Sequence, residues 1–589
     1  MRKLLALLLC VSMVFGLTAF AAEPYADGVH TGQGTGIGGM VTVTVTVENG
    51  AIAQVTVDNH TETPGLSDPA IAQVPEAIVA ANSPEVDTVA GATITSEAIM
   101  EAVKNALSGA GEAASEDQEI TIQPDVIVVG AGLAGLVSAV KAAELGAKVL
   151  VFEQNVRVGG SALFAGGSIS GAGFKIQKEM GVEDSPEQFY QDFVRLSGGE
   201  DFNTEIARVH TERSGPAIDW LQDEVGVDFG AEYRLDTGSY YPMFPDRVTY
   251  ALAMSPAGGA LGFLQALTPR LDEYIAKGQA QLLLNTEVTD VILEDGAVVG
   301  VMVDDLAVYA PATIIATGGY GYSEDWLLEY NFDQVTSANP PTATGSGYNF
   351  ARKAGAVFEK MEFCYAYPGS VPVSGFQATV TANTRIPGVV LVDQSGQRIF
   401  DETSSGASDA YKAADNNVLY ALVAQSMITE EAPLFRSAVG AAPVDSPAKL
   451  QELLAEGKYV FKADSIEELA ELIGAENLPA AIAQYNLDCA AGEDSLFGRS
   501  ANLIPLEEGP FYAVYTIPYV LMTSGGPRIN GQAQLVRADD SVVAGAYLAG
   551  EIIGSANVGG NTTIGGIGHG LCVTWGIIAA ENAVAEANK

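Results

Sequence analysis

The sequence is short of cysteine, histidine and basic residues. Its 589 residues include four cysteines and four histidines, and 29 lysines and arginines stand against 73 aspartates and glutamates, a formal net charge of −44 at pH 7. Negative charge of this size repels phosphate backbones and anionic membrane surfaces, so we expect no nucleic-acid partner. We expect the excess of acidic residues to give an acidic, well-solvated surface.

The cysteines are too few and too scattered for a disulfide framework. Cys10 lies in an apolar run at the N-terminus, and Cys364, Cys489 and Cys572 form an odd, widely spaced set beyond it. Their expected use is apolar packing. No C-x-x-C-H sequence occurs, which excludes the usual attachment site of c-type haem. The four histidines are also scattered, so we expect no metal site.

The N-terminus has the three parts of a secretory signal peptide. Arg2 and Lys3 precede the apolar run, and Ala19-Phe20-Ala21 ends it as a small-x-small cleavage site. We therefore expect residues 1–21 to be removed and the protein to be secreted, in the periplasm or at the bacterial cell surface. An uncleaved anchor is the alternative. No later segment has the roughly 20 unbroken apolar residues of a membrane span.

The most informative pattern is a strand, a glycine turn, a helix and a second strand closed by an acid. Val126–Val129 is a β-branched run suited to a strand buried on both faces. Gly130, Gly132 and Gly135 then fill the positions of G-x-G-x-x-G, which allow a tight turn, close approach to a pyrophosphate and close helix packing. Glu153 ends the second strand, where it can accept hydrogen bonds from a ribose. This spacing predicts a dinucleotide site.

Further glycine-rich motifs are scattered along the chain. Gly159-Gly160-Ser161 follows the acid, Ala316–Gly319 ends a strand-like run, and Ala549-Gly550-Glu551 lies near the C-terminus. An extended FAD would contact such separated segments, so the scatter favours FAD over NAD. The expected FAD-binding residues are Gly130, Gly132, Gly135, Glu153, Gly159, Gly160, Ser161, Gly258, Gly259, Thr317, Gly318, Gly319, Glu551 and Asn561.

At these motifs the chain resembles the fumarate reductase/succinate dehydrogenase flavoprotein superfamily, chiefly its soluble fumarate reductase branch and the related 3-ketosteroid dehydrogenases. The resemblance covers residues 124–589. It implies an α/β fold in which a Rossmann-like FAD-binding domain, 124–363 and 500–589, carries an inserted α+β cap domain, 364–499, over the substrate. The multihaem domain of some relatives is absent, so electrons must enter by another route.

A separate small α+β unit is expected ahead of this domain, because the chain is too long for one ordinary core. It covers residues 24–108, and residues 109–123 read as a linker that begins with small and acidic residues. Met40–Glu48 alternates with period two, and Asn49-Gly50 marks a hairpin turn.

A string near the end of this unit resembles the flavinylation site of FMN-binding domains. It reads D-x-x-x-G-A-T-x-T from Asp87 to Thr95. In that family a threonine carries FMN through a phosphodiester that a separate flavin transferase installs, and the matching residue is Thr93. The alternative is an ordinary turn in which Thr95 or Ser96 caps the following helix.

The substrate positions implied by the resemblance depart from the family. Its two substrate-binding histidines fall on Tyr367 and Met522, one arginine falls on Asn557, and the proton-donating arginine falls on or near Gly406. Arg385 still matches an arginine of the family's proton relay. The alternative is that the alignment is shifted and that arginines such as Arg385, Arg398 or Arg528 enter the pocket from elsewhere.

The four replacements all remove a cation or a potential cation. Leaving a carboxylate desolvated without its partner costs on the order of 3–5 kcal/mol, so they favour a neutral, enone-like acceptor of up to steroid size. Tyrosine, with an ordinary pKa of about 10, is a neutral donor that could bind a ketone. The expected catalytic residues are Tyr367, Tyr519, Tyr241, Asn557 and Arg385.

The resemblance implies a secreted FAD-dependent oxidoreductase acting on CH–CH bonds. Electrons would pass from a membrane or extracellular donor linked to flavin or quinone, through covalent FMN to noncovalent FAD, and as a hydride to an activated C=C bond of a small-molecule acceptor. Three alternatives stay open: a reductase of an unsaturated carboxylate of the fumarate, urocanate or acrylate type, a dehydrogenase running in the oxidative direction, and an extracellular flavin electron carrier.

Overall fold

The computed structural model describes most of the chain, which divides into two compact units. The described residues are 25–36, 40–60, 62, 67–108, 119–179, 181, 183–229, 260–404, 407–438, 441, 443–561 and 564–589. One unit comprises residues 1–63 and 67–115, and the other comprises residues 64–66 and 116–589. Outside the described residues lie the predicted signal peptide 1–21, residues 109–118 of the predicted linker, Tyr241, Gly258, Gly259 and Gly406.

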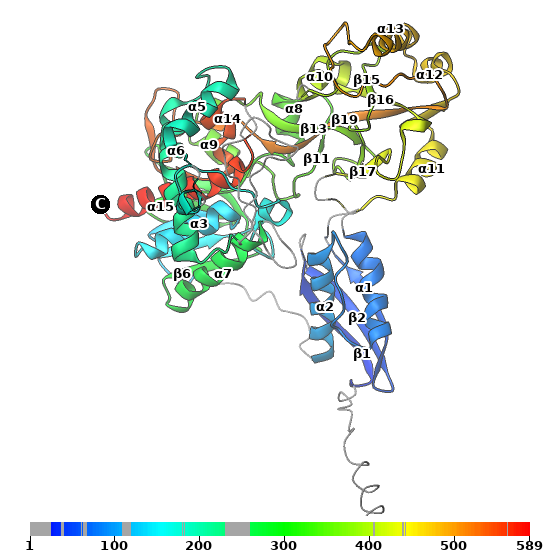
Figure 1. Cartoon of the computed structure of the whole chain (residues 1–589). Coiled ribbons are helices and arrows are strands. Elements are labelled where there is room, and N and C mark those ends of the chain that lie inside the picture. Colours follow the sequence, from blue (N-terminus) through cyan, green and yellow to red (C-terminus); the bar gives the residue numbers. More distant parts are fainter. Residues whose placement is uncertain are drawn as a thin grey trace, which may run out of the picture. The chain divides into compact units, whose positions relative to one another are not determined.

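The smaller unit is an antiparallel three-stranded sheet with two helices (Figure 1). Its elements are β1 (Gly28–Thr35), β2 (Met40–Glu48), β3 (Ala51–Asn59), α1 (Asp68–Ala81) and α2 (Thr93–Ser108). The alternation of β2 sends its four valines into the core. Asn49 and Gly50, both with positive φ, make the predicted hairpin turn to β3. α2 lies very close to β1: a Cβ on Gly34 of β1 would come within 2.0 Å of the carbonyl oxygen of Ala98 in α2, so only glycine fits there.

The larger unit is built around a six-stranded, largely parallel sheet. Its order is β21 (Gln534–Val536), β22 (Val542–Leu548), β10 (Ala312–Ile315), β4 (Val126–Val129), β5 (Val149–Phe152) and β6 (Ala280–Leu283). All neighbours are parallel except β21, which is antiparallel to β22. Every residue of β4, β5 and β10 is buried, as expected for strands covered on both faces. The predicted Rossmann-like α/β fold is confirmed.

Helices bring the two ends of this unit's sequence together. α3 (Leu133–Glu144), which follows β4, packs against α7 (Leu261–Ala276) and against the C-terminal helix α15 (Ile567–Ala587). α15 also contacts β10, β22 and β4. The other elements outside the second large sheet are η1 (Gly160–Phe164), α4 (Lys175–Glu179), α5 (Pro186–Ser197), α6 (Thr204–Trp220), η2 (Leu221–Val225), β7 (Val288–Glu294), β8 (Ala297–Val303), β9 (Leu306–Tyr309), α8 (Glu324–Tyr330), α9 (Ser346–Lys353), β12 (Phe358–Glu359), β20 (Gly526–Pro527), η5 (Glu551–Ile553) and α14 (Ser555–Gly559).

The second large sheet occupies the predicted cap region. Its path is β15 (Val390–Val392), β16 (Leu419–Ala424), β19 (Phe511–Thr523), β13 (Cys364–Val371), β14 (Val380–Ala382) and β17 (Phe435–Ser437), and β11 (Thr336–Ser337) and β18 (Val460–Ala463) also pair with β19. The helices of this region are α10 (Ala407–Ala413), η3 (Asp415–Asn417), η4 (Gln425–Met427), α11 (Ser446–Glu456), α12 (Ile466–Ile473) and α13 (Leu478–Ala491).

β19 joins this sheet although it lies beyond residue 500. Its first half pairs with β16 and β18, and its second half pairs with β13 and β11. Figure 1 shows it running through the sheet as one long strand. The predicted domain boundaries at residues 363/364 and 499/500 stay predictions.

The part of the chain that the structure describes has no helix long and apolar enough to cross a membrane. These residues also bring no three potential metal-ligating side chains together. Cys364, Cys489 and Cys572 are unpaired. Burial raises the pKa of the Cys364 and Cys572 thiols to about 12, which suits packing rather than reactivity.

Candidate active site

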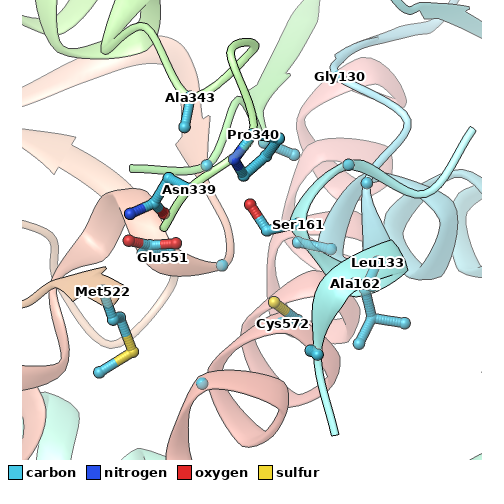
Figure 2. A pocket seen from close by; sticks show the side chains of 18 of the residues that line it. Gly130, Leu133, Ser161, Ala162, Asn339, Pro340, Ala343, Met522, Glu551 and Cys572 are labelled. Carbon is cyan, nitrogen blue, oxygen red and sulfur yellow. The ribbon is translucent and has the colours of Figure 1, made fainter. Parts of the chain in front are cut away.

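A cavity of about 510 Å³ lies at the carboxyl ends of the parallel strands. Segments that follow β4, β5, β10 and β22 all contribute to its wall, as in other open α/β sheets. The expected FAD-binding residues on this wall are Gly130, Gly132, Glu153, Gly159, Gly160, Ser161, Thr317, Gly318 and Glu551. Figure 2 shows the side chains of Ser161, Asn339 and Glu551 facing a common space. Gly135, Gly319 and Asn561 lie outside the described wall, and Asn561 is exposed.

The three glycines of the first turn have different surroundings. Gly130 has φ +96°, and a Cβ there would come within 2.7 Å of the Ala316 carbonyl oxygen. A Cβ on Gly135 would lie 1.8 Å from the Gly130 carbonyl oxygen, so α3 approaches β4 as closely as backbone allows. Gly132 precedes α3, and a Cβ added to it would lie 3.9 Å from its nearest described neighbour, the Gly159 carbonyl oxygen. The second position is therefore the open one, next to the helix N-terminus that can face a phosphate.

Glu153 is held in place by the backbone. It is 7% exposed, its Oε2 accepts a hydrogen bond from the Ala131 amide (2.7 Å), and its Oε1 accepts one from the Asn155 amide (2.9 Å). Burial raises the pKa of its carboxyl group, and the backbone hydrogen bonds oppose that shift. The fixed carboxylate on the cavity wall can accept hydrogen bonds from sugar hydroxyls.

Glu551 and Thr317 provide polar atoms farther along the wall. The Glu551 Oε1 accepts hydrogen bonds from the amide and the hydroxyl of Thr523, both at 2.8 Å. Burial raises the pKa of Glu551. The Thr317 hydroxyl is buried and has no partner among the described residues. This unsatisfied hydroxyl and the glycine turn fit a cofactor that has a pyrophosphate and many hydroxyl groups, as FAD has.

Two tyrosines of β13 lie on the wall. Tyr365 pairs with Met522 and Tyr367 with Tyr519 across β13 and β19, and Tyr365, Tyr367 and Met522 line the cavity. The ring centroids of Tyr365 and Tyr367 are 5.0 Å apart, and those of Tyr367 and Tyr519 are 5.4 Å apart. Tyr519 is 6% exposed, packs with Ala378, and is not among the residues of the described wall. Tyr367 reaches the cavity, Tyr519 backs it, and Tyr365 is a wall residue that sequence reasoning had not singled out as functional.

Asn557 and Arg385 do not line the described wall. The Asn557 side-chain amide donates hydrogen bonds to the Ile553 carbonyl (2.8 Å) and the Gly526 carbonyl (3.2 Å), and the residue is 2% exposed. Arg385 is exposed. The side chain of Asn557 therefore stabilises the backbone around α14.

Arg398 and Arg528, which could have supplied a cation to the cavity, form ion pairs elsewhere. Arg398 is buried in an ion cluster with Glu402 and Asp494, with Nη2 at 2.8 and 2.9 Å from their carboxylate oxygens. Arg499 joins the cluster through Glu402. Arg528 pairs with Glu359 and Asp540. Neither Arg398 nor Arg528 lines the described wall.

His569, in the first turn of α15, is a wall residue that sequence reasoning missed. Its Nδ1 lies 2.6 Å from the Ser168 carbonyl oxygen, and its ring centroid is 5.5 Å from that of Phe263. The only signal in the sequence was its place in the last glycine-rich segment before the C-terminal helix. The described wall contains Glu153, Glu287 and Glu551 but neither lysine nor arginine.

The smaller unit contains a second candidate site at the start of α2. Thr93 is its first residue and is half-buried. Thr95 is buried and donates a hydrogen bond to the Glu62 carboxylate. The Ser96 hydroxyl donates to the Ala92 carbonyl (2.9 Å) and accepts from the Val89 amide (3.0 Å). Of these three hydroxyls, Thr93 alone has no hydrogen bond within the described residues.

Comparisons with known proteins show two flavin-binding domains in this chain. A family model described as an FAD binding domain matches residues 125–568, and one described as an FMN-binding domain matches residues 36–108. The chain is 28% identical to the urocanate reductase of Eggerthella lenta, over 95% of this chain and 92% of that one. In structure it resembles the open conformation of a flavocytochrome c3 fumarate reductase, with a TM-score of 0.58, 24% identity, and coverage of 80% of this chain and 79% of that one.

Two further relatives are longer than this chain. It is 28% identical to the NADH:acrylate oxidoreductase of Vibrio harveyi and 31% identical to the NADH:fumarate oxidoreductase of Klebsiella pneumoniae. The matches cover 95% and 87% of this chain but 61% and 54% of those proteins. The chain belongs to the FAD-binding family of the fumarate reductase/succinate dehydrogenase flavoprotein superfamily, and it carries an FMN-binding domain ahead of the FAD-binding domain.

Proposed function

We propose that the protein is a flavin-dependent reductase of the C=C bond of an unsaturated carboxylate. The observation that carries this proposal is the match to a urocanate reductase over 95% of this chain and 92% of that relative, a span that takes in both flavin domains here. The two longer relatives are named for acrylate and fumarate, which are also unsaturated acids. The relatives thus favour this alternative over the neutral acceptor that the substitutions in the sequence suggest.

The residues of the cavity have separate tasks in this reaction. FAD, when bound, supplies the hydride. The turn at Gly130 and Gly132 and the carboxylate of Glu153 would hold its pyrophosphate and ribose, and Thr317 and Glu551 would bind further polar groups. Tyr367 would donate a hydrogen bond to the carbonyl oxygen that activates the C=C bond, where negative charge develops during reduction.

Thr93 is the proposed attachment point of FMN. Its hydroxyl is unengaged among the described residues, whereas Thr95 and Ser96 are hydrogen-bonded. We infer that a flavin transferase modifies Thr93 and that electrons from a membrane or extracellular donor pass through FMN to FAD. Secretion through residues 1–21 belongs to the same proposal. A flavin that is attached by a transferase and reduced by a membrane or extracellular donor suits a protein outside the cytoplasm.

A neutral enone is the second candidate acceptor. It is favoured by the absence of lysine and arginine from the described wall and by the presence there of Tyr365, Tyr367 and Met522. Buried carboxylates without a cationic partner are strongly disfavoured. A steroid-like ketone would need no such partner.

Anaerobic turnover with reduced viologen tests these candidates. The kcat/KM values for urocanate, acrylate and fumarate would be compared with those for the matching amides or methyl esters and for a neutral enone. We expect the acids to be the better substrates. Better turnover of the neutral compounds would support the hypothesis of an enone acceptor. An absence of turnover in both the reductive and the oxidative direction would support an electron carrier.

A further inference from the structure

Among the described residues that line the cavity, His569 is the only side chain that can become a cation near neutral pH. The resemblance implies that the family's two substrate histidines fall on Tyr367 and Met522, and three glutamates lie on the same wall. A carboxylate that enters this cavity therefore needs a positive charge, and His569 is where the described wall can provide one.

The structure fixes the orientation of the His569 ring. Its Nδ1 lies 2.6 Å from the Ser168 carbonyl oxygen, which can only accept a hydrogen bond, so Nδ1 carries a proton in both charge states. The ring packs against Phe263, with 34° between their planes. Its Nε2 has no protein partner among the described residues and is not sealed from the cavity, whereas both ring nitrogens of His210 are buried without a partner. The titratable nitrogen therefore opens on the cavity.

His569 also lies next to the wall expected to contact the acceptor. A Cβ on the preceding residue, Gly568, would lie 3.5 Å from the Met522 sulfur. Met522 occupies a position where the resemblance implies a substrate-binding histidine, and it pairs with Tyr365 on β13. The first turn of α15 thus brings a histidine beside a position that has lost one.

We propose that His569, as an imidazolium, binds the carboxylate of the acceptor through Nε2–H and so determines the enzyme's preference for acids. This inference rests on the proposed reduction of an unsaturated carboxylate. In the absence of the acceptor His569 is neutral, and binding of the carboxylate is coupled to uptake of one proton by Nε2.

The surroundings make this charge conditional on the ligand. Burial lowers the pKa of His569, and the hydrogen bond to Ser168 opposes that shift. Among the described residues, the titratable groups that share its wall or pack on α15 are Glu153, Glu287, Glu551, Tyr365, Tyr367, Cys572 and His210. None of them is a cation at neutral pH, because glutamate, tyrosine and cysteine side chains have no cationic form and burial lowers the pKa of His210 to about 3. A carboxylate bound at Nε2 would stabilise the imidazolium through a direct hydrogen bond.

Nuclear magnetic resonance of the holoenzyme labelled in its histidine rings tests the inference without turnover. The chain has only four histidines, so the His569 signal can be assigned from its loss in His569→Gln. Propionate and succinate serve as unreactive carboxylate probes, and propionamide serves as the neutral control. We expect the carboxylates, and not the amide, to shift this signal and raise its titration midpoint.

Kinetics of the same variants separate the failures. His569→Gln should lower kcat/KM for the unsaturated acid about 10- to 100-fold, the usual range for losing a hydrogen bond to a charged group, and should leave FAD absorbance and turnover of the matched ester nearly unchanged. His30→Gln, in the smaller unit, is the control. Equal losses for acid and ester, loss of FAD, or an unshifted His569 signal in an enzyme that reduces acids would overturn the inference alone. Failure of the wild type to reduce any acid would overturn the proposed function, whatever the signal shows.

Discussion

Tyr367 combines a place on the cavity wall with a neutral hydrogen-bond donor. We predict that Tyr367→Phe lowers kcat by about 100-fold or more, because losing one donor to developing negative charge costs about 2.7–4 kcal/mol. FAD absorbance should be retained, since Tyr367 is not among the residues expected to hold the cofactor. Tyr519→Phe is the matched control: its ring backs Tyr367 but lies off the described wall, so its effect should be much smaller. Equal losses in both variants would argue for a packing role.

Single residues also show where sequence reasoning stops. The places of Gly130, Gly132, Glu153 and Glu551 on the cavity wall could be predicted, because a fixed spacing after a strand implies a fixed place at the sheet edge. Tyr519 could not be told from Tyr367, because only the pairing of β13 with β19 decides which ring reaches the cavity. His569 was missed because its significance depends on Ser168, which is 401 residues away in the sequence.

The βαβ element at the start of the larger unit permits a paired test of its glycines. We predict that Gly135→Ala destabilises the protein by about 3 kcal/mol or more, because its Cβ would lie 1.8 Å from a backbone oxygen that has no room to move. Gly132→Ala meets no atom closer than 3.9 Å, so it should fold normally and bind FAD more weakly. Thermal unfolding and FAD content measure the two effects. Similar melting temperatures for both variants would contradict this assignment.

The ion cluster of Arg398, Glu402, Asp494 and Arg499 should make the stability of the cap region sensitive to acid. Burial raises the pKa of Asp494, but its hydrogen bonds and ion pair with Arg398 outweigh burial and hold it at about 2. Because this pKa is depressed in the folded state, the stabilisation is complete above the unfolded pKa of about 3.9 and is lost as pH falls toward 2. We expect it to be worth about 2 kcal/mol. The free energy of unfolding, measured from pH 5 to pH 2, should fall less steeply in Asp494→Asn than in the wild type.

The elements of the FAD-binding domain were predictable, and those of the cap region were less so. β4, α3 and β5 follow from an uninterrupted local pattern of buried strand, glycine turn and helix. β19 is different, because one 13-residue strand pairs with four others from separate parts of the chain. Such pairing is set by tertiary contacts, and a local pattern cannot reveal it.

The charge of the whole molecule should affect its kinetics. A net charge of −44 repels a carboxylate acceptor at long range, and salt shortens that range from about 30 Å at 0.01 M to about 8 Å at 0.15 M. We therefore predict that raising the ionic strength lowers KM for an unsaturated acid and leaves KM for its ester unchanged. Parallel changes for both compounds would point to a salt effect on the protein itself.

The two flavin domains of the whole chain predict two reducible centres. In a host that expresses the flavin transferase, mass spectrometry should find FMN on the peptide that contains Thr93. Thr93→Ala should lack it, keep its FAD, and take up half as many reducing equivalents in an anaerobic titration. Thr88→Ala is the matched control, because it removes an exposed threonine from the same loop and should keep both flavins. Since a relay through FMN requires the covalent group, Thr93→Ala should retain turnover with a small reduced viologen that reaches FAD directly and lose it with a donor that reduces only FMN. An FMN adduct that persists in Thr93→Ala would place the attachment on another hydroxyl.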